Sequence, residues 1–89
     1  MNQLARLEHI LYRMVKAKAL TNENSARHLD INLGEISREI GCTVNDVHRL
    51  LTQLQKKGEI KALIQVGFDK NNYTLTVLED SSIMNFYTS

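Results

Sequence analysis

The sequence predicts an α+β domain in which an N-terminal amphipathic helix is followed by two helices joined by a tight turn and by a C-terminal β-hairpin. Apolar residues recur at intervals of three and four in residues 2–19 and 43–57, which is typical of amphipathic helices. In residues 59–78 they alternate with polar residues, which is typical of strands. The chain has 89 residues, 43% hydrophobic and 24% charged, and this composition indicates a single globular domain over residues 1–89.

The first predicted helix covers about residues 2–19, and its apolar face includes Leu4, Leu7, Leu11 and Met14. These four positions also match the seam of a coiled coil, although two heptads are fewer than a coiled coil usually needs. Two interpretations remain open: this face packs only into the core of its own domain, or it is also shared at a dimer interface. Because a domain of this size gains stability from a partner, we expect a homodimer through this helix and the C-terminal segment.

The segment after the first helix is polar and indicates a connection with a helical turn of its own. Leu29 and Ile31 are expected in a short strand beside the later hairpin. Asn32 then offers its side-chain oxygen as the N-cap of a short second helix over residues 33–40.

The turn between the second and third helices is the strongest local signal in the chain. Gly41 stands where the second helix must end, because a left-handed residue at a helix C-terminus is unstrained only for glycine. Thr43 is a preferred N-cap for the next helix, and Asp46 stands three residues later, as in a capping box. We therefore predict a three-residue turn and a third helix over residues 43–57 that ends at Gly58.

Two alternating segments predict a hairpin over residues 59–78. The residues expected on one face of it are Ile60, Ala62, Ile64 and Val66 in the first strand, and Tyr73, Leu75 and Val77 in the second. Residues 67–72, GFDKNN, supply turn chemistry for a loop of about six residues. We expect Phe68 in this loop to pack against the hairpin.

The C-terminal segment, residues 79–89, is too apolar for a purely solvated tail. It contains Ile83, Met84, Phe86 and Tyr87. We expect it to fold back on the domain or onto a partner.

The reactive residues give no pattern of an enzyme or of a metal site. His9, His28 and His48 are spaced too widely for any two to share a helix face as metal ligands. No glycine-rich phosphate loop follows a strand, and we predict no catalytic residue, metal or cofactor. Cys42 is the only cysteine and occupies a turn position that suits an apolar plug, so we interpret it as a structural thiol rather than a nucleophile or redox sensor.

The net charge and the hydropathy of the chain indicate which partners and which cellular location to expect. The net charge is +1, whereas nucleic-acid-binding domains are usually strongly basic, and this counts against nucleic acid as a partner. No segment has the length of an apolar membrane span, and the first residues lack the pattern of a signal peptide. We therefore expect no membrane partner and a cytoplasmic location, or a nuclear one in a eukaryote.

The segment ISREIGCTVNDVHRLLTQLQKKGEI, residues 36–60, resembles the helix-turn-helix of the winged-helix superfamily, in which two such helices precede a β-hairpin called the wing. Gly41, Val47 and the ending Leu54, Gly58 and Ile60 fall in register with that pattern. The resemblance covers about fifty of the 89 residues and implies a three-helix winged helix-turn-helix fold. It leaves function open, because the superfamily includes transcription regulators, replication proteins and modules that bind only protein.

No subfamily is identified. The residues VHRLLTQLQKKGEI are similar to the recognition helix of the left-handed-DNA binders, which combine an Asn and a Tyr on that helix with a Pro-Pro-Trp wing. Here the two helix positions are His48 and Leu51, and the chain has no proline and no tryptophan.

The resemblance implies candidate DNA contacts on the third helix, whose first residues would lie deepest in the major groove. Asn45 and Arg49 are the first choices for base contact, because Asn pairs with adenine and Arg with guanine through two hydrogen bonds each. Arg38 and the wing would steady the DNA backbone. The full set of predicted DNA-binding residues is Arg38, Thr43, Asn45, His48, Arg49, Thr52, Gln53, Lys56, Lys70, Asn71 and Asn72.

Several of these assignments have alternatives. Thr43 caps a helix whether or not it also faces a phosphate, and His48 is as readily a surface residue without a role. The lysines at the end of the third helix form either a solvated face or a binding cluster. Asp46 and Asp69 would place negative charge near the phosphates and oppose binding.

The leading hypothesis is a double-stranded DNA-binding protein, a transcriptional regulator or replication-control factor, that acts as a homodimer. The alternative is a winged-helix module that binds protein within a larger assembly. Near-neutral charge and the apolar C-terminal segment favour the alternative, whereas the small size of the chain favours DNA.

Overall fold

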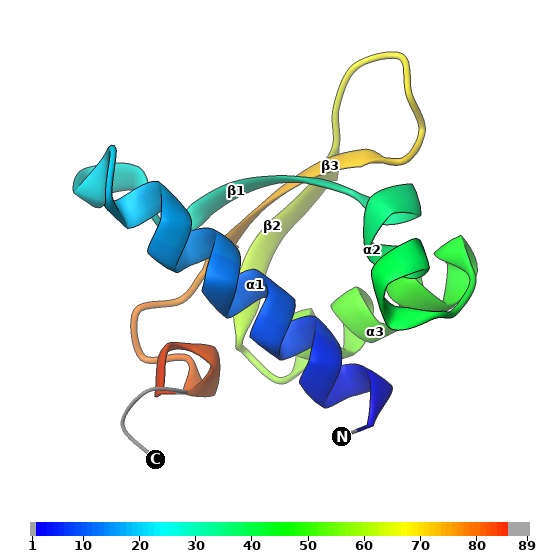
Figure 1. The fold of residues 1–89 in the computed structure, drawn as a ribbon, viewed down its shortest axis with the longest axis horizontal. Coiled ribbons are helices and arrows are strands. Elements are labelled where there is room, and N and C mark those ends of the chain that lie inside the picture. Colours follow the sequence, from blue (N-terminus) through cyan, green and yellow to red (C-terminus); the bar gives the residue numbers. More distant parts are fainter. Residues whose placement is uncertain (1, 86–89) are drawn as a thin grey trace.

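The computed structural model describes residues 2–85 and has three helices packed on a three-stranded antiparallel sheet (Figure 1). The elements in chain order are α1 (Gln3–Ala19), η1 (Glu23–Ser25), β1 (His28–Asn32), α2 (Leu33–Ile40), α3 (Val44–Lys56), β2 (Ile60–Gln65), β3 (Asn72–Val77) and η2 (Ser82–Asn85), where η marks a short 3-10 helix. The sheet order is β1-β3-β2, so β3 is central. The α+β class, the helical turn in the connection and the short strand at Leu29 and Ile31 are confirmed.

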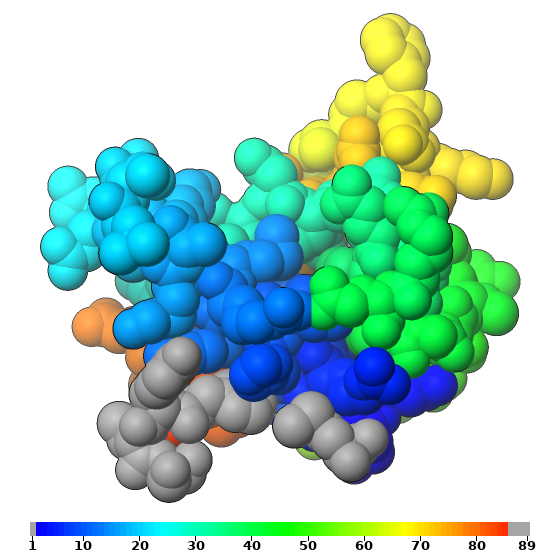
Figure 2. Space-filling model, in the orientation of Figure 1, coloured from blue at the N-terminus to red at the C-terminus, as the bar shows by residue number. Residues whose placement is uncertain are grey.

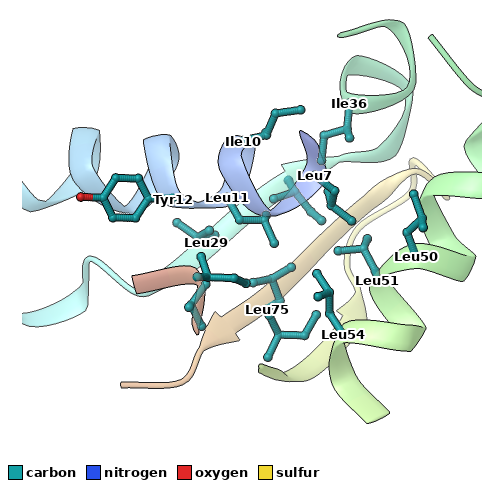
Figure 3. Close-up of a cluster of buried hydrophobic side chains, with 14 of the residues drawn as sticks. Leu7, Ile10, Leu11, Tyr12, Leu29, Ile36, Leu50, Leu51, Leu54 and Leu75 are labelled. Atoms are coloured by element: carbon teal, nitrogen blue, oxygen red, sulfur yellow. The ribbon is translucent and has the colours of Figure 1, made fainter. Parts of the chain in front are cut away.

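One hydrophobic core joins the helices to the sheet (Figure 3). Leu7 and Leu11 of α1, Leu51 of α3 and Leu75 of β3 are at most 2% exposed and point into the same interior. Leu4 and Met14, the other two positions of the heptad pattern, are partly buried against this core. The apolar face of α1 is thus used inside the monomer, and a dimer through α1 would need other side chains of that helix.

The predicted helix ends are confirmed in detail. The Asn32 side-chain oxygen accepts a hydrogen bond from the Glu35 N–H at 3.0 Å and begins α2. Gly41 ends α2 with φ of 83°, in the left-handed region. Thr43 and Asp46 form a capping box, in which the Thr43 hydroxyl accepts from the Asp46 N–H at 3.0 Å and the Asp46 carboxylate accepts from the Thr43 N–H at 3.2 Å. The turn of three residues fixes the relative direction of α2 and α3.

The predicted alternation of the first hairpin strand is wrong beyond Lys61. A β-bulge lies between Lys61 and Ile64, with Ala62 at φ of 57°. One extra residue in β2 exchanges the two faces of the strand from that point on. Ile60 is therefore buried as predicted, but Ala62, Ile64 and Val66 are exposed. The prediction for the second strand is confirmed, since Leu75 and Val77 are buried and Tyr73 is partly buried.

The described part of the C-terminal segment folds back on the domain. Ile83 in η2 is 0% exposed and belongs to the core. The Glu59 carboxylate holds the segment, because it accepts hydrogen bonds from the Ser81 hydroxyl and from the Ser82 hydroxyl and N–H. The predicted contacts of Phe86 and Tyr87 lie outside the described residues.

Candidate nucleic-acid interface

The polar face of α3 is free of contacts with the core. The buried residues of this helix are Val47, Leu50, Leu51 and Leu54. Of the predicted contact residues on the opposite side, the exposed ones are Asn45, His48, Arg49, Gln53 and Lys56. Because helical periodicity separates the two sets, burying the first set on the sheet necessarily turns the second set outward.

Two predicted α3 contacts are engaged within the helix. The Arg49 guanidinium forms an ion pair with Asp46 at 3.0 Å, and its side chain is 58% exposed. This hydrogen bond from Arg49, followed by those from Thr43, holds the pKa of Asp46 below its usual value. The Thr52 hydroxyl donates to the His48 carbonyl at 2.9 Å. This pair uses one nitrogen of the guanidinium, so other N–H donors of Arg49 remain for a contact with a base. Within residues 2–85, no hydrogen bond holds the Asn45 side chain.

A groove of about 500 Å³ separates the start of α3 from the β2–β3 hairpin. Its lining residues are Leu33, Val44, Asn45, His48, Gln65, Lys70, Asn71 and Tyr73. The His48 ring lies 5.7 Å from the Tyr73 ring at an angle of 59°. His48 is thus exposed, as expected, but it also packs against the hairpin and forms one wall of the groove.

Gln65 and Tyr73 are groove residues that the sequence pattern did not single out. Their register partnership across β2 and β3 puts both side chains on the same face of the sheet. Regular alternation from Ile60 would have placed Gln65 on the opposite face. The bulge at Ala62 brings it to the groove, and a bulge residue other than glycine or asparagine leaves no local signal in the sequence.

The hairpin loop, residues 66–71, is held to α2 by hydrogen bonds. The Leu33 N–H donates to the Asn71 carbonyl at 2.8 Å, and the Asn32 amide donates to the Asn72 side-chain oxygen at 2.8 Å. The Asp69 carboxylate accepts from the Asn71 N–H at 2.9 Å. Asn72 thus serves the anchoring of the loop, and Asp69 shapes its turn.

Arg38 lies beside the loop, on the exposed side of α2. A Cβ atom on Gly34 would stand 3.6 Å from the Arg38 guanidinium and 3.7 Å from the Asn71 side-chain nitrogen. The same Cβ would stand 3.0 Å from the capping oxygen of Asn32, so Gly34 lies where the helix cap, a donor of α2 and a donor of the hairpin loop come together. Arg38, Lys56 and Lys70 are exposed and have no ion pair among residues 2–85.

Phe68 does not pack against the hairpin, and that prediction is wrong. Its side chain is 108% exposed relative to the reference state, so nothing in the described structure covers it. The hairpin loop projects beyond the rest of the domain (Figures 1 and 2), which leaves the side chains at its end without neighbours.

The remaining reactive groups form no site in the described part of the chain. Burial raises the pKa of the Cys42 thiol, and the nearby Asp46 carboxylate raises it further, so a thiolate is disfavoured. Within residues 2–85, no cluster of His, Cys, Asp and Glu is large enough to hold a metal ion. Among the same residues no helix has the length and hydropathy to span a membrane.

Comparison with known proteins gives no relative: no protein-family model, curated protein or solved structure matches the chain. Inferences about function therefore depend on the residues and their arrangement alone.

Proposed function

We propose that this chain is a winged-helix protein that binds double-stranded DNA, with α3 in the major groove and the hairpin loop as the wing. The observation that carries the proposal is the exposed polar face of α3, which continues across the groove to the loop. The order α1-β1-α2-α3-β2-β3, with the left-handed Gly41 between α2 and α3, supports the same assignment. The proposed role is in transcriptional regulation or in replication control.

In this arrangement α3 reads the bases. A major groove about 12 Å wide admits one helix, and the N-terminal residues of that helix reach furthest. Asn45 stands in the first turn of α3 and lines the groove toward the hairpin loop, and its side chain has no hydrogen bond to another residue of 2–85. Arg49 lies one turn later and contacts a base edge through the guanidinium donors that its pair with Asp46 leaves free.

The cations around α3 bind the DNA backbone. Lys70 lines the groove between α3 and the loop, Arg38 lies beside the loop on α2, and Lys56 stands at the other end of α3. The amide of Asn71 adds a donor on the same wall as Lys70. A strand of the sugar-phosphate backbone that passes between α3 and the loop would meet donors from both sides.

A homodimer would double these few contacts and would place two half-sites about one helical turn apart. The apolar stripe of α1 and Ile83 already belong to the monomer core. The proposed dimer therefore uses exposed parts of α1 or the last residues of the chain.

The second candidate is a protein-interaction module, and the exposed apolar residues of the hairpin favour it. Ile64 of the edge strand β2 is 56% exposed, and Val66, just after this strand, is 39% exposed. A binding assay with duplex DNA separates the two candidates.

The test compares two exposed arginines, each in an ion pair, of which only Arg49 lies on the proposed interface. Arg49 pairs with Asp46 on α3 and is 58% exposed, whereas Arg13 of α1 pairs with Glu39 and is 53% exposed. By fluorescence anisotropy on a mixed pool of short duplexes at low salt, Arg49→Ala should weaken binding about tenfold and Arg13→Ala should leave it unchanged. Asn45→Ala should weaken binding without disturbing an ion pair. No binding by the wild-type chain, or equal losses in Arg49→Ala and Arg13→Ala, would contradict the proposal.

A further inference from the structure

Phe68 is the most exposed large apolar side chain among the described residues. At 108% it exceeds Leu20, which is 89% exposed after the end of α1. An uncovered aromatic ring of this size is unfavourable in water and gains free energy when another surface covers it. The end of a projecting loop gives such a ring access to narrow spaces that the body of the domain cannot enter (Figure 1).

The loop that carries Phe68 has a defined conformation. The Val66 N–H donates to the Asn72 carbonyl at 2.9 Å, and the Asn72 N–H donates to the Asp69 carbonyl at 3.0 Å. Gly67, at φ of 73°, makes the turn just before the ring. The backbone of the loop is thus ordered before it meets a partner, which lowers the conformational entropy that insertion of the ring would cost.

The neighbours of Phe68 favour DNA as the partner. Lys70 and Asn71 follow within three residues and line the groove opposite Asn45 and His48. Asp69, between Phe68 and Lys70, is not among the groove residues, and its carboxylate accepts the Asn71 N–H within the loop. Lys70 and the neighbouring donors in this groove would bind anionic groups, and the Phe68 ring would bind an apolar surface. The partner that fits both therefore has anionic groups next to an apolar interior. Duplex DNA has that order, with phosphates outside and stacked bases inside.

The edge of β2 is poorly suited to the main alternative, a second chain that extends the sheet. The bulge at Ala62 interrupts the regular spacing of edge hydrogen bonds. The Leu63 N–H already donates to the Gln55 side-chain oxygen at 3.2 Å. An added strand would have to displace that bond and follow an irregular edge.

We propose that Phe68 enters the minor groove next to the major groove that α3 occupies, and that its ring wedges between two base pairs. This inference rests on the proposed function. Apolar wedges of this kind partly unstack one base step and bend the duplex by about 20–90° toward the major groove. Pyrimidine–purine steps such as TA and CA unstack most easily, so they should be preferred at the wedge position, which gives sequence preference without a hydrogen bond to a base.

The experiment uses Phe68→Trp, because the chain contains no tryptophan and the variant has a single indole, which can be excited selectively over the tyrosines. Leu20→Trp is the matched control, since Leu20 is also an exposed apolar residue and follows the C-terminal end of α1. Both variants are titrated with duplexes that carry a TA step, while anisotropy of a labelled duplex reports binding. We expect the Phe68→Trp emission to be quenched and protected from acrylamide on binding, and the Leu20→Trp emission to stay unchanged.

A second pair of variants separates the wedge from phosphate contact. Phe68→Ala should weaken duplex binding about tenfold, reduce DNA bending in a permuted-fragment gel assay and leave the salt dependence unchanged. Lys70→Ala should reduce the salt dependence and leave the bend in place.

Three results would overturn the wedge. If Phe68→Trp binds duplex while its emission stays constant, the wedge is wrong and DNA binding stands. If its emission changes with protein concentration in the absence of DNA, a second copy of the chain covers the ring instead. If the wild-type chain binds no duplex, the proposed function fails and the wedge fails with it.

Discussion

The salt dependence of duplex binding follows from the number of free cations on the proposed interface. Arg38, Lys56 and Lys70 are exposed and unpaired within residues 2–85, whereas Arg49 is paired with Asp46. Each phosphate contact contributes about 0.9 to the slope of log affinity against log salt. Three contacts predict a slope of about −2.7 for one chain, so raising the salt from about 50 mM to about 200 mM should weaken binding about 40-fold.

The expected slope changes with the number of phosphate contacts. Lys70→Ala removes one contact and should lower the slope to about −1.8, which is about a 12-fold loss over the same salt range. If Arg49 leaves Asp46 for a phosphate, the slope rises to about −3.6 and the loss to about 150-fold. A homodimer on two half-sites doubles the slope of the three-contact case to about −5.4. The slope therefore reports how many cations contact phosphates, and it stays at the three-contact value if Arg49 contacts a base, as proposed.

The assay is anisotropy of a labelled duplex at several salt concentrations, with Arg13→Ala as the control for a charge removed outside the interface. Arg13→Ala should keep the wild-type slope, because Arg13 lies on α1 and is paired with Glu39. A slope near zero in the wild-type chain would refute the assignment of these cations to phosphates. A wild-type slope retained in Lys70→Ala would refute the placement of the hairpin loop on DNA.

Two further predictions concern stability, measured by urea denaturation. Gly41→Ala should lower the free energy of unfolding by about 1–2 kcal/mol, because φ of 83° is strained for any residue with a Cβ. The strain would come from the backbone alone, since nothing lies within 4 Å of the added atom. Unchanged stability would contradict this interpretation of the turn. Glu59→Gln should lower it by about 1–2 kcal/mol at neutral pH, since the carboxylate accepts three hydrogen bonds from Ser81 and Ser82. These bonds, that of Ser81 first, lower the pKa of Glu59 from 4.5, so its stabilisation is complete above about pH 4.5 and is lost as the pH falls through the lowered native value. The difference between wild type and Glu59→Gln should therefore shrink in acid, and a constant difference down to about pH 3 would contradict the assignment.

The helices and their ends follow from local sequence. Gly41, Thr43 and Asp46 act on backbone groups within a few residues of themselves, so their effect is the same in any surrounding fold. The apolar stripe of α3 likewise determines which residues face outward, since helix geometry is fixed. For this reason the exposed set on α3, including Asn45 and Arg49, could be predicted without a structure.

Tertiary structure decided the register of the hairpin strands and the contacts and exposure of each predicted contact residue. The bulge at Ala62 carries no turn residue, yet it reverses the faces of β2 and brings Gln65 to the groove, because register depends on pairing with β3. Phe68 is exposed because the loop projects from the sheet, and the composition of the loop does not predict how far it projects. Sequence alone therefore determined the elements and the outward face of α3, which arise from short-range backbone geometry. Only the folded chain decided which side chains meet across the groove, because those contacts join residues far apart in the sequence.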